Sequence, residues 1–219
     1  MSMFTVHTIP GSPAARAVIA ALVEKGAGFR VAGLGPGAHK APAHLARNPF
    51  GKMPVLEHGP FELYETQAIL RYLDRVLPSP LLTPPDPRDA ARMDQIMGIS
   101  DWYLFQGVSD VIGFQRIVGP QLLGSTPDEA AIEAALPGAH VVFGELSRLL
   151  GGKPFLAAQT MTLADLLVAP HIDFLAQTPE WSDLTRDRGN LQAWWARMAG
   201  RSCMMSTTWE AVSRLALAS

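Results

Sequence analysis

The sequence predicts an α+β domain followed by an all-helical domain, and two observations support this expectation. Short β-branched and aromatic runs alternate with helical patterns in the first part of the chain, whereas every periodic segment after a proline-rich stretch has helical spacing. We place the first domain at residues 1–77, the linker at 78–86 and the helical domain at 87–219. A chain of 219 residues is long enough for two domains that each bury a core.

Composition excludes several classes of protein. Hydrophobic residues make up 48% and charged residues 17% of the chain, which is typical of a compact globular protein. The net charge of −2 argues against nucleic acid as a partner, because binding phosphates requires a basic face. Neither a secretion signal nor an apolar run of membrane-spanning length is present, so we expect a cytoplasmic protein that does not enter membranes.

Cysteine and histidine usage argues against a metal site. Cys203 is the one cysteine of the chain, so neither a disulfide framework nor a cysteine-based zinc site is possible. The histidines outside the loop at 39 lack the spacing of metal ligands, and solvated or core histidines account for them better. We therefore expect neither a metal nor a permanently bound cofactor.

The first elements form a β-α-β unit. Residues 4–9 are predicted to be a strand, and Ser12 and Pro13 then begin a helix as its N-cap and first residue. The helix ends at the glycines of 26–28, and residues 29–32 form a second, parallel strand. A short helix at 43–47 follows.

The next stretch contains a proline that a strand does not explain. The apolar run 53–56 begins as Met53-Pro54, and proline cannot donate to a sheet ladder. A cis Met53–Pro54 bond is plausible, because only X–Pro bonds adopt cis at low cost. Such a bond would turn the backbone of Met53 outward, where a peptide could pair with it like an added strand.

A strand at 61–64 leads directly into a helix. Glu65 and Thr66 stand at this junction, and free N–H groups at a helix N-terminus bind carboxylates. Glu65 would bind an amine, and Thr66 with the helix terminus a carboxylate. The residues thus predict a site for a small peptide that carries both groups.

This stretch resembles the glutathione-binding half of the glutathione S-transferases. NPFGKMPVL and LYETQAILRYL match the family's NP-x-G-x-x-P-x-L and L-x-E-S-x-A-I-x-x-Y-L in residue type and spacing. Thr66 departs from the usual serine but keeps the hydroxyl. The resemblance implies a thioredoxin-like first domain, with glutathione as co-substrate rather than as a bound cofactor.

Ser12 is the candidate catalytic residue. The glutathione thiol titrates near ~8.5, and lowering this pKa by about two units requires roughly 2.7 kcal/mol. One hydrogen bond to the anion supplies roughly 1.5–3 kcal/mol. Ser12 matches the catalytic serine of the serine-type classes, and the chain looks most like the phi class or a bacterial relative. Ser12 can also simply cap the helix, and the two roles are compatible because a hydroxyl both donates and accepts.

The resemblance assigns further glutathione contacts. His39 and Lys40 match the phi-type pair on the glycine carboxylate, although a solvated loop accounts equally well for His39. Lys52 stands where phi members carry glutamine and could reach the same carboxylate or be merely exposed. Met53 would pair through its backbone with the cysteinyl unit, next to Pro54 as the family's cis-proline.

The second domain is predicted to consist of helices throughout. Asp86 caps a long helix that reaches about residue 118, and its glycines should bend it. The other expected features are a capping box at 126–129 with a kink at Pro137, a second box at Thr162 and Asp165 with a kink at Pro170, a cap at Asn190, and a last helix from Ser206 or Thr207 to Leu217.

The resemblance also implies two partners. An apolar electrophile would lie between Ser12 and the first long helix, where Trp102, Phe105 and Phe114 either line a pocket or belong to the core. Phe50, at the tip of its turn, would insert into a second copy and make a homodimer.

We therefore expect a detoxifying glutathione transferase that joins the thiolate to a hydrophobic electrophile. Reduction of organic peroxides by the same thiolate is a close variant. The rival is a binding protein of the same fold without activity. Three features leave room for this binding protein. They are Thr66, the alanine-rich first helix, and Arg16, which lies one position from where phi members keep a basic residue.

Overall fold

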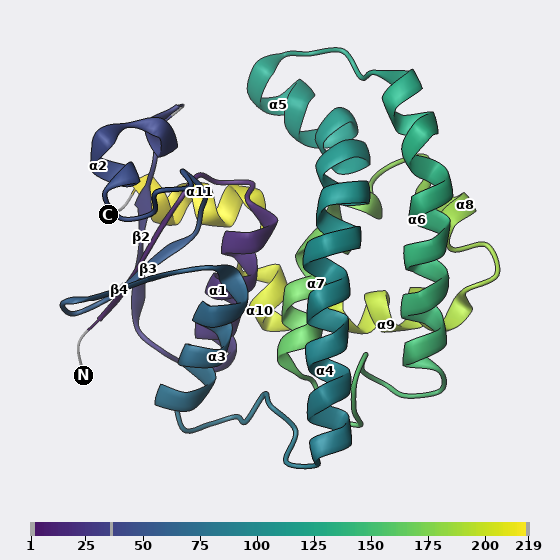
Figure 1. The fold of residues 1–219 in the computed structure, drawn as a ribbon, viewed down its shortest axis with the longest axis horizontal. Helices are drawn as coiled ribbons and strands as arrows, with labels where there is room; N and C mark the ends of the chain where they lie inside the picture. The colour runs from purple at the N-terminus through teal and green to yellow at the C-terminus, as the bar shows by residue number, and fades with distance from the viewer. Residues whose placement is uncertain (1–2, 36, 218–219) are drawn as a thin grey trace. The chain divides into compact units, whose positions relative to one another are not determined.

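The computed structural model describes residues 3–35 and 37–217, which form two compact units. The first unit holds the chain up to Leu81 and the segment from Arg201 onward, and the second spans Leu82–Gly200. The predicted domains also include residues 1–2, 36 and 218–219, which lie outside the described part. Figure 1 shows that the sheet belongs to the first unit. The sequence-based division placed residues 201–217 in the helical domain, whereas here they pack with the sheet.

A four-stranded sheet in the order β2-β1-β3-β4 organises the first unit. β1 and β2 are parallel, and the other two pairs are antiparallel. The predicted order β-α-β-α-β-β-α is confirmed, with an additional 3₁₀ turn, η1, before α2. The elements are β1 (Phe4–Thr8), α1 (Pro13–Glu24), β2 (Phe29–Gly33), η1 (Ala38–Lys40), α2 (Pro42–Leu45), β3 (Val55–His58), β4 (Phe61–Tyr64) and α3 (Thr66–Val76).

Apolar side chains of the strands and of two helices form the core of this unit. They follow the alternation of a strand or the three-to-four spacing of a helix, so each element buries one face. The fully buried members include Val6, Val31, Leu56, Ile19, Leu22, Ile69 and Leu73.

A buried lysine joins the ends of α1 and α3. The Lys25 ammonium donates to Asp74 Oδ1 at 2.6 Å and to the carbonyls of Leu77 and Pro80 at 3.1 and 2.6 Å. A buried charge is costly unless it is paired and hydrogen-bonded, and these acceptors satisfy both conditions. Lys25 thus fixes the start of the linker against the first unit.

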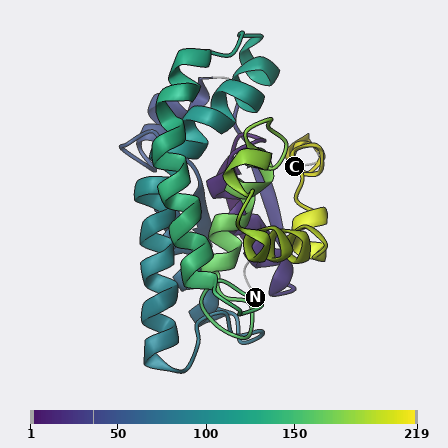
Figure 2. The ribbon, with the colours of Figure 1, turned by 90° about the vertical axis from the view of Figure 1, so that its right-hand side faces the viewer.

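The C-terminal helices α10 (Ser202–Met205) and α11 (Trp209–Leu217) complete the first unit. Figures 1 and 2 show them in yellow beside the N-terminal elements. A Cβ at Gly33 would lie 2.9 Å from Cβ of Ala216, so the missing side chain lets α11 approach β2 closely. This long-range contact explains why the segment does not group with the helical unit.

The regular elements of the second unit are all helices in its described residues, as predicted. No helix in the described part of the chain has the length and apolarity needed to cross a membrane. The helices of the second unit are α4 (Pro87–Ile99), η2 (Ser100–Val118), α5 (Gly119–Leu123), α6 (Glu129–Leu150), α7 (Leu163–Leu175), α8 (Trp181–Leu184) and α9 (Gly189–Ala199).

The first long helix changes its winding after Ile99. It continues as a π-helix, η2, in place of the bent α-helix that its glycines predict. Its buried residues include Ser100, Leu104, Val108 and Ile112, four residues apart. In a helix with i→i+5 hydrogen bonds, which turns more slowly than an α-helix, this spacing keeps the buried side chains close to one line along the axis.

Two predicted caps are confirmed. Asp86 accepts from the backbone of Arg88 and Asp89 at the start of α4. Asp165, fully buried, accepts from the backbone and hydroxyl of Thr162, from Leu156 N and from Trp194 Nε1, all at 2.8 Å. Burial raises the pKa of this carboxyl. α6 and α7 each run on through their internal prolines.

Other predicted helix starts are wrong. Asp128, not Thr126, caps α6, because its carboxylate accepts from Ala131 N at 3.1 Å. α9 begins at Gly189, before Asn190.

The side chain of Asn190 has another role. It donates to the carbonyls of Ser147 and Gly151 at the end of α6. At the last helix, the capping hydroxyl comes from Thr208 rather than from Ser206 or Thr207.

A buried histidine makes the second unit sensitive to acid. His171, in α7, has its Nδ1 3.0 Å from Ser109 Oγ and its ring 5.6 Å from that of Phe105. Burial lowers its pKa to about 4. The unfolded chain binds the proton near ~6.5, so protonation favours unfolding.

We predict that stability contributed by His171 is complete above pH 6.5 and falls as the pH drops toward 4. At pH 5 the loss should be about 2 kcal/mol relative to pH 7.5. Chemical unfolding of the wild type and of His171→Gln at the two pH values measures this loss in the free energy of unfolding. Equal pH dependence in both proteins would contradict the prediction.

Candidate active site

The register of the sheet brings four segments to one of its ends. Thr8 pairs with Gly33, His7 with Val55, and Val55 with Tyr64. The chain therefore leaves β1, β2 and β4, and enters β3, at the same end. These four segments carry the predicted site residues Ser12, His39, Lys40, Lys52, Met53, Pro54, Glu65 and Thr66.

Ser12 is the N-cap of α1, as predicted. Its Oγ accepts from Ala15 N at 3.3 Å, and Pro13 occupies the first turn. The side chain is half-buried, and its proton has no acceptor among the described residues. A hydroxyl placed in this way can accept from the helix and still donate outward.

The Met53 segment lies against the loop that carries Ser12. The Met53–Pro54 bond is cis, as the sequence predicts. Ile9 N donates to Met53 Sδ at 3.4 Å. Strand pairing begins at Val55, so the backbone of Met53 stands outside the ladder.

Two buried side chains hold the carbonyl of Lys52. His44 Nε2 lies 2.8 Å from this oxygen, and Asn48 Nδ2 donates to it at 3.0 Å. Asn48 Oδ1 in turn accepts from Phe50 N at 3.1 Å. The turn before Met53 is thus fixed from inside, while the Lys52 side chain is exposed.

The same turn packs on the segment of His39 and Lys40. Gly51 has φ +59°, and a Cβ there would lie 3.1 Å from the His39 carbonyl and 3.2 Å from Lys40 Cδ. Only glycine both adopts this positive φ without strain and leaves room for these close contacts. This close packing places the turn that carries Lys52 beside the segment of His39 and Lys40.

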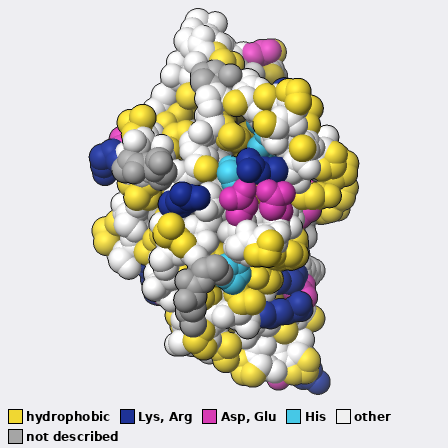
Figure 3. Space-filling view, turned by 90° about the vertical axis from the view of Figure 1, so that its left-hand side faces the viewer, with side chains coloured by type: hydrophobic (Ala, Val, Ile, Leu, Met, Phe, Trp, Pro, Cys, Tyr) yellow, Lys and Arg dark blue, Asp and Glu magenta, His cyan; other side chains and the backbone are white. Residues whose placement is uncertain are grey.

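Arg47 ties this turn to the hairpin. Its guanidinium contacts Glu57 at 3.0 Å and Glu62 at 2.9 Å. His7 Nε2 lies 2.9 Å from the Glu57 carboxylate, and burial is the main cause that lowers the pKa of this histidine. On the face shown in Figure 3, acidic side chains gather near the centre beside a basic one, and the basic side chains are scattered rather than forming a stripe.

Glu65 has an unusual backbone. Among the described residues it is the one non-glycine residue with positive φ, at +71°. Such a conformation costs about 1–3 kcal/mol and concentrates at functional sites. Glu65 is exposed, and Thr66 after it is the first residue of α3. The predicted junction of strand and helix N-terminus is confirmed.

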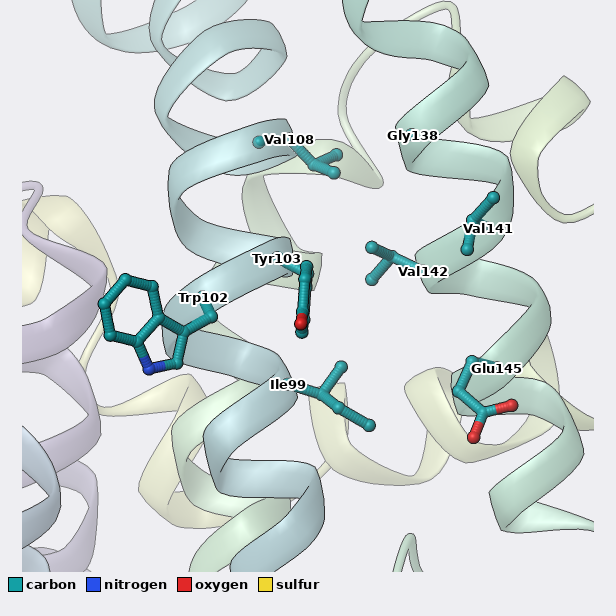
Figure 4. Close-up of a pocket in the computed structure, with 9 residues that line it drawn as sticks. Ile99, Trp102, Tyr103, Val108, Gly138, Val141, Val142 and Glu145 are labelled. Atoms are coloured by element: carbon teal, nitrogen blue, oxygen red, sulfur yellow. The ribbon is translucent and has the colours of Figure 1, made fainter.

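The second unit contains an apolar pocket of about 480 Å³ between η2 and α6. Figure 4 shows Tyr103, Val108 and Val142 directed into it, with Trp102 at its border and Glu145 at one end. Glu145 pairs with Arg148 at 2.7 Å, and this hydrogen bond lowers its pKa.

The other two aromatic candidates do not line this pocket. The ring of Phe105 lies near His171, and that of Phe114 lies beside Gly119.

Sequence reasoning missed two contributors to the site. It treated His44 as a solvated or core histidine, because nothing in the local sequence marks a partner eight residues later. It also missed Trp209, whose indole lies against Gly11 beside Ser12. In the described part of the chain, no group of three histidine, cysteine or acidic residues could hold a metal.

Comparison with known proteins identifies the family. Residues 2–75 match the model of the glutathione S-transferase N-terminal domain, and residues 110–202 match that of the C-terminal domain. Glutathione S-transferase 3 of Zea mays is 31% identical over 212 residues, 94% of each chain. The probable glutathione S-transferase GSTF2 of Oryza sativa subsp. japonica is 31% identical over 185 residues, 84% of this chain and 85% of its own.

A solved structure agrees over nearly the whole length. Glutathione transferase F7 from Populus trichocarpa superposes with a TM-score of 0.83 at 26% identity, covering 97% of this chain and 99% of its own. The match extends across the sheet and the helices alike. The chain therefore belongs to the glutathione S-transferase family, and it is similar to phi-type members of plants.

Proposed function

We propose that this protein activates the thiol of glutathione and joins the thiolate to a small hydrophobic electrophile. The observation that carries the proposal is Ser12, whose hydroxyl caps α1 and keeps its proton for an outside acceptor. Only the thiolate is a good nucleophile, so one donor at a helix N-terminus lowers the barrier by favouring the anion.

Glutathione would bind along the end of the sheet described above. The backbone of Met53 pairs with the cysteinyl unit like an added strand. Glu65 takes the amine of the γ-glutamyl group, and Thr66 with the N-terminus of α3 takes its carboxylate. Lys40 and Lys52 supply positive charge to the glycine carboxylate, and His39 donates a hydrogen bond to it.

The chemistry favours the cytoplasm as the place of action, because reduced glutathione is kept there and thiols stay free. Reduction of an organic peroxide would use the same thiolate, with a different second substrate. The alternative function is binding without thiol activation. Thr66 in place of serine supports it, and the serine experiment below separates the two.

We propose further that two copies associate through Phe50. Its side chain is 65% exposed although the backbone of its turn is held by Asn48. The pocket between η2 and α6 is apolar and opened by Gly107 and Gly138, where a Cβ would meet nothing within 4 Å. A phenyl ring of a second copy fits a pocket of this size and polarity.

Ser12→Ala should return the pKa of bound glutathione to the free value, whereas in the wild type it should lie about two units lower. Ultraviolet titration of the bound thiolate measures both. Ser12→Thr, which keeps donor and cap, should retain most of the shift. A wild-type thiol that binds yet titrates as in water would reject the enzyme in favour of the binding protein.

His44→Leu removes one of the two groups that hold the Lys52 carbonyl. We expect KM for glutathione to rise roughly tenfold with kcat nearly unchanged, because binding geometry is lost but Ser12 is not. His44→Gln, which restores a donor, should recover part of the affinity. Equal KM values in all three proteins would show that His44 is only a packing residue.

Phe50→Ala should weaken the dimer by roughly 30-fold or more, as truncation of an anchor residue does. Analytical ultracentrifugation over a dilution series measures the dissociation constant. Gly138→Leu, which fills the pocket, should also weaken the dimer. Phe61→Ala removes a phenyl group that is 45% exposed on the hairpin and serves as the control. A monomeric wild type, or an unchanged dissociation constant in Phe50→Ala, would contradict the proposed role of Phe50.

A further inference from the structure

The C-terminal segment reaches the loop that carries Ser12. A Cβ at Gly11 would lie 2.6 Å from Cη2 and Cζ3 of Trp209 and 2.8 Å from its Cε3. The edge of the indole therefore occupies the space that a side chain at residue 11 would fill. Trp209 is the first residue of α11 and is half-buried.

Gly11 needs such support because it has no side chain of its own to pack. Its φ of +87° is a conformation that side chains other than glycine's rarely adopt, so the loop before Ser12 must contain a glycine. On its other side, Ile9 is held through its N–H to Met53 Sδ. Trp209 and Met53 thus hold the Ser12 loop at two places.

The segment that leads into Trp209 is held by long-range contacts within the first unit. Arg16, one turn after Ser12, donates to the Met204 carbonyl at 3.0 Å and to Thr207 Oγ1 at 3.4 Å. Arg201 pairs with Glu24 near the end of α1. The segment that leads into α11 is therefore bound along the helix that Ser12 caps.

The far end of α11 is held as well. Ala216 packs against Gly33 of β2 at the distance that only glycine allows. Val212, in the middle of the helix, is 4% exposed. The indole of Trp209 is thus part of a fixed arrangement rather than a side chain resting on the surface.

We propose that Trp209 is a positioning residue for the catalytic serine, which rests on the role proposed for Ser12. The indole holds Gly11 so that the Ser12 hydroxyl is directed at the sulfur of glutathione. A displacement of about 1 Å in a catalytic group costs about 100-fold in rate. The groups that hold the rest of glutathione, at Met53, Glu65 and Thr66, come from other segments of the chain, so we expect them to keep their places when this contact is lost.

The test compares Trp209→Ala, Trp209→Phe and Val212→Ala in the full-length protein. Thiolate titration should show the bound thiol of Trp209→Ala about one unit above that of the wild type. Its kcat with a chromogenic aryl halide should fall about fivefold at pH 6.5, because a one-unit rise lowers the thiolate fraction by about that factor, while KM for glutathione stays within about twofold. The deficit should disappear above about pH 9, where the thiol ionises without help.

The other two variants separate positioning from packing. Trp209→Phe keeps a ring against Gly11 and should recover most of the shift. Val212→Ala weakens the same helix but keeps the indole, so it should lower the melting temperature and leave the thiol pKa unchanged.

Two outcomes overturn the inference, and both require that the wild type activates the thiol and that Ser12→Ala abolishes the activation. One is a Trp209→Ala protein with the thiol pKa of the wild type. The other is a loss of activity that is equal at all pH values and is reproduced by Val212→Ala. A wild type that leaves the thiol at its free pKa would instead reject the function proposed for Ser12, and with it the role given to Trp209.

Discussion

The register at Val55 is the constraint on which the site depends. This residue pairs with His7 on one side and with Tyr64 on the other, so it fixes β1, β3 and β4 against one another at one end. A slip of one residue would turn the buried faces outward, which the apolar core forbids. The segments that carry the predicted site residues all adjoin the sheet at this end.

The protein stabilises this end with contacts that do not involve the ligand. His44 and Asn48 hold a carbonyl, Gly51 allows two segments to touch, and Trp209 fills the space beside Gly11. The strained backbone of Glu65 belongs to the same region. A donor that must meet a developing charge works only when its position is fixed beforehand, and these contacts supply that fixation.

Local signals made Ser12 and the motif from Asn48 to Thr66 predictable, because a cap, a turn and a strand-to-helix junction each depend on neighbouring residues. The long-range contributors gave no such signal. Trp209 lies almost 200 positions after Gly11, and the two meet because α10 packs on α1 and α11 packs on β2.

Competing local choices explain the smaller differences. Thr126 and Asp128 can both cap a helix, and the fold uses the second. A spacing of four residues is common to α- and π-helices, so the winding of η2 could not be read from its apolar pattern.

A crystal structure of the protein with glutathione tests the central claim most directly. We predict that the sulfur lies within hydrogen-bond distance of Ser12 Oγ, with the cysteinyl backbone paired to Met53. The amine should lie at Glu65. Glutathione bound elsewhere, or bound here with its sulfur directed away from Ser12, would contradict the account.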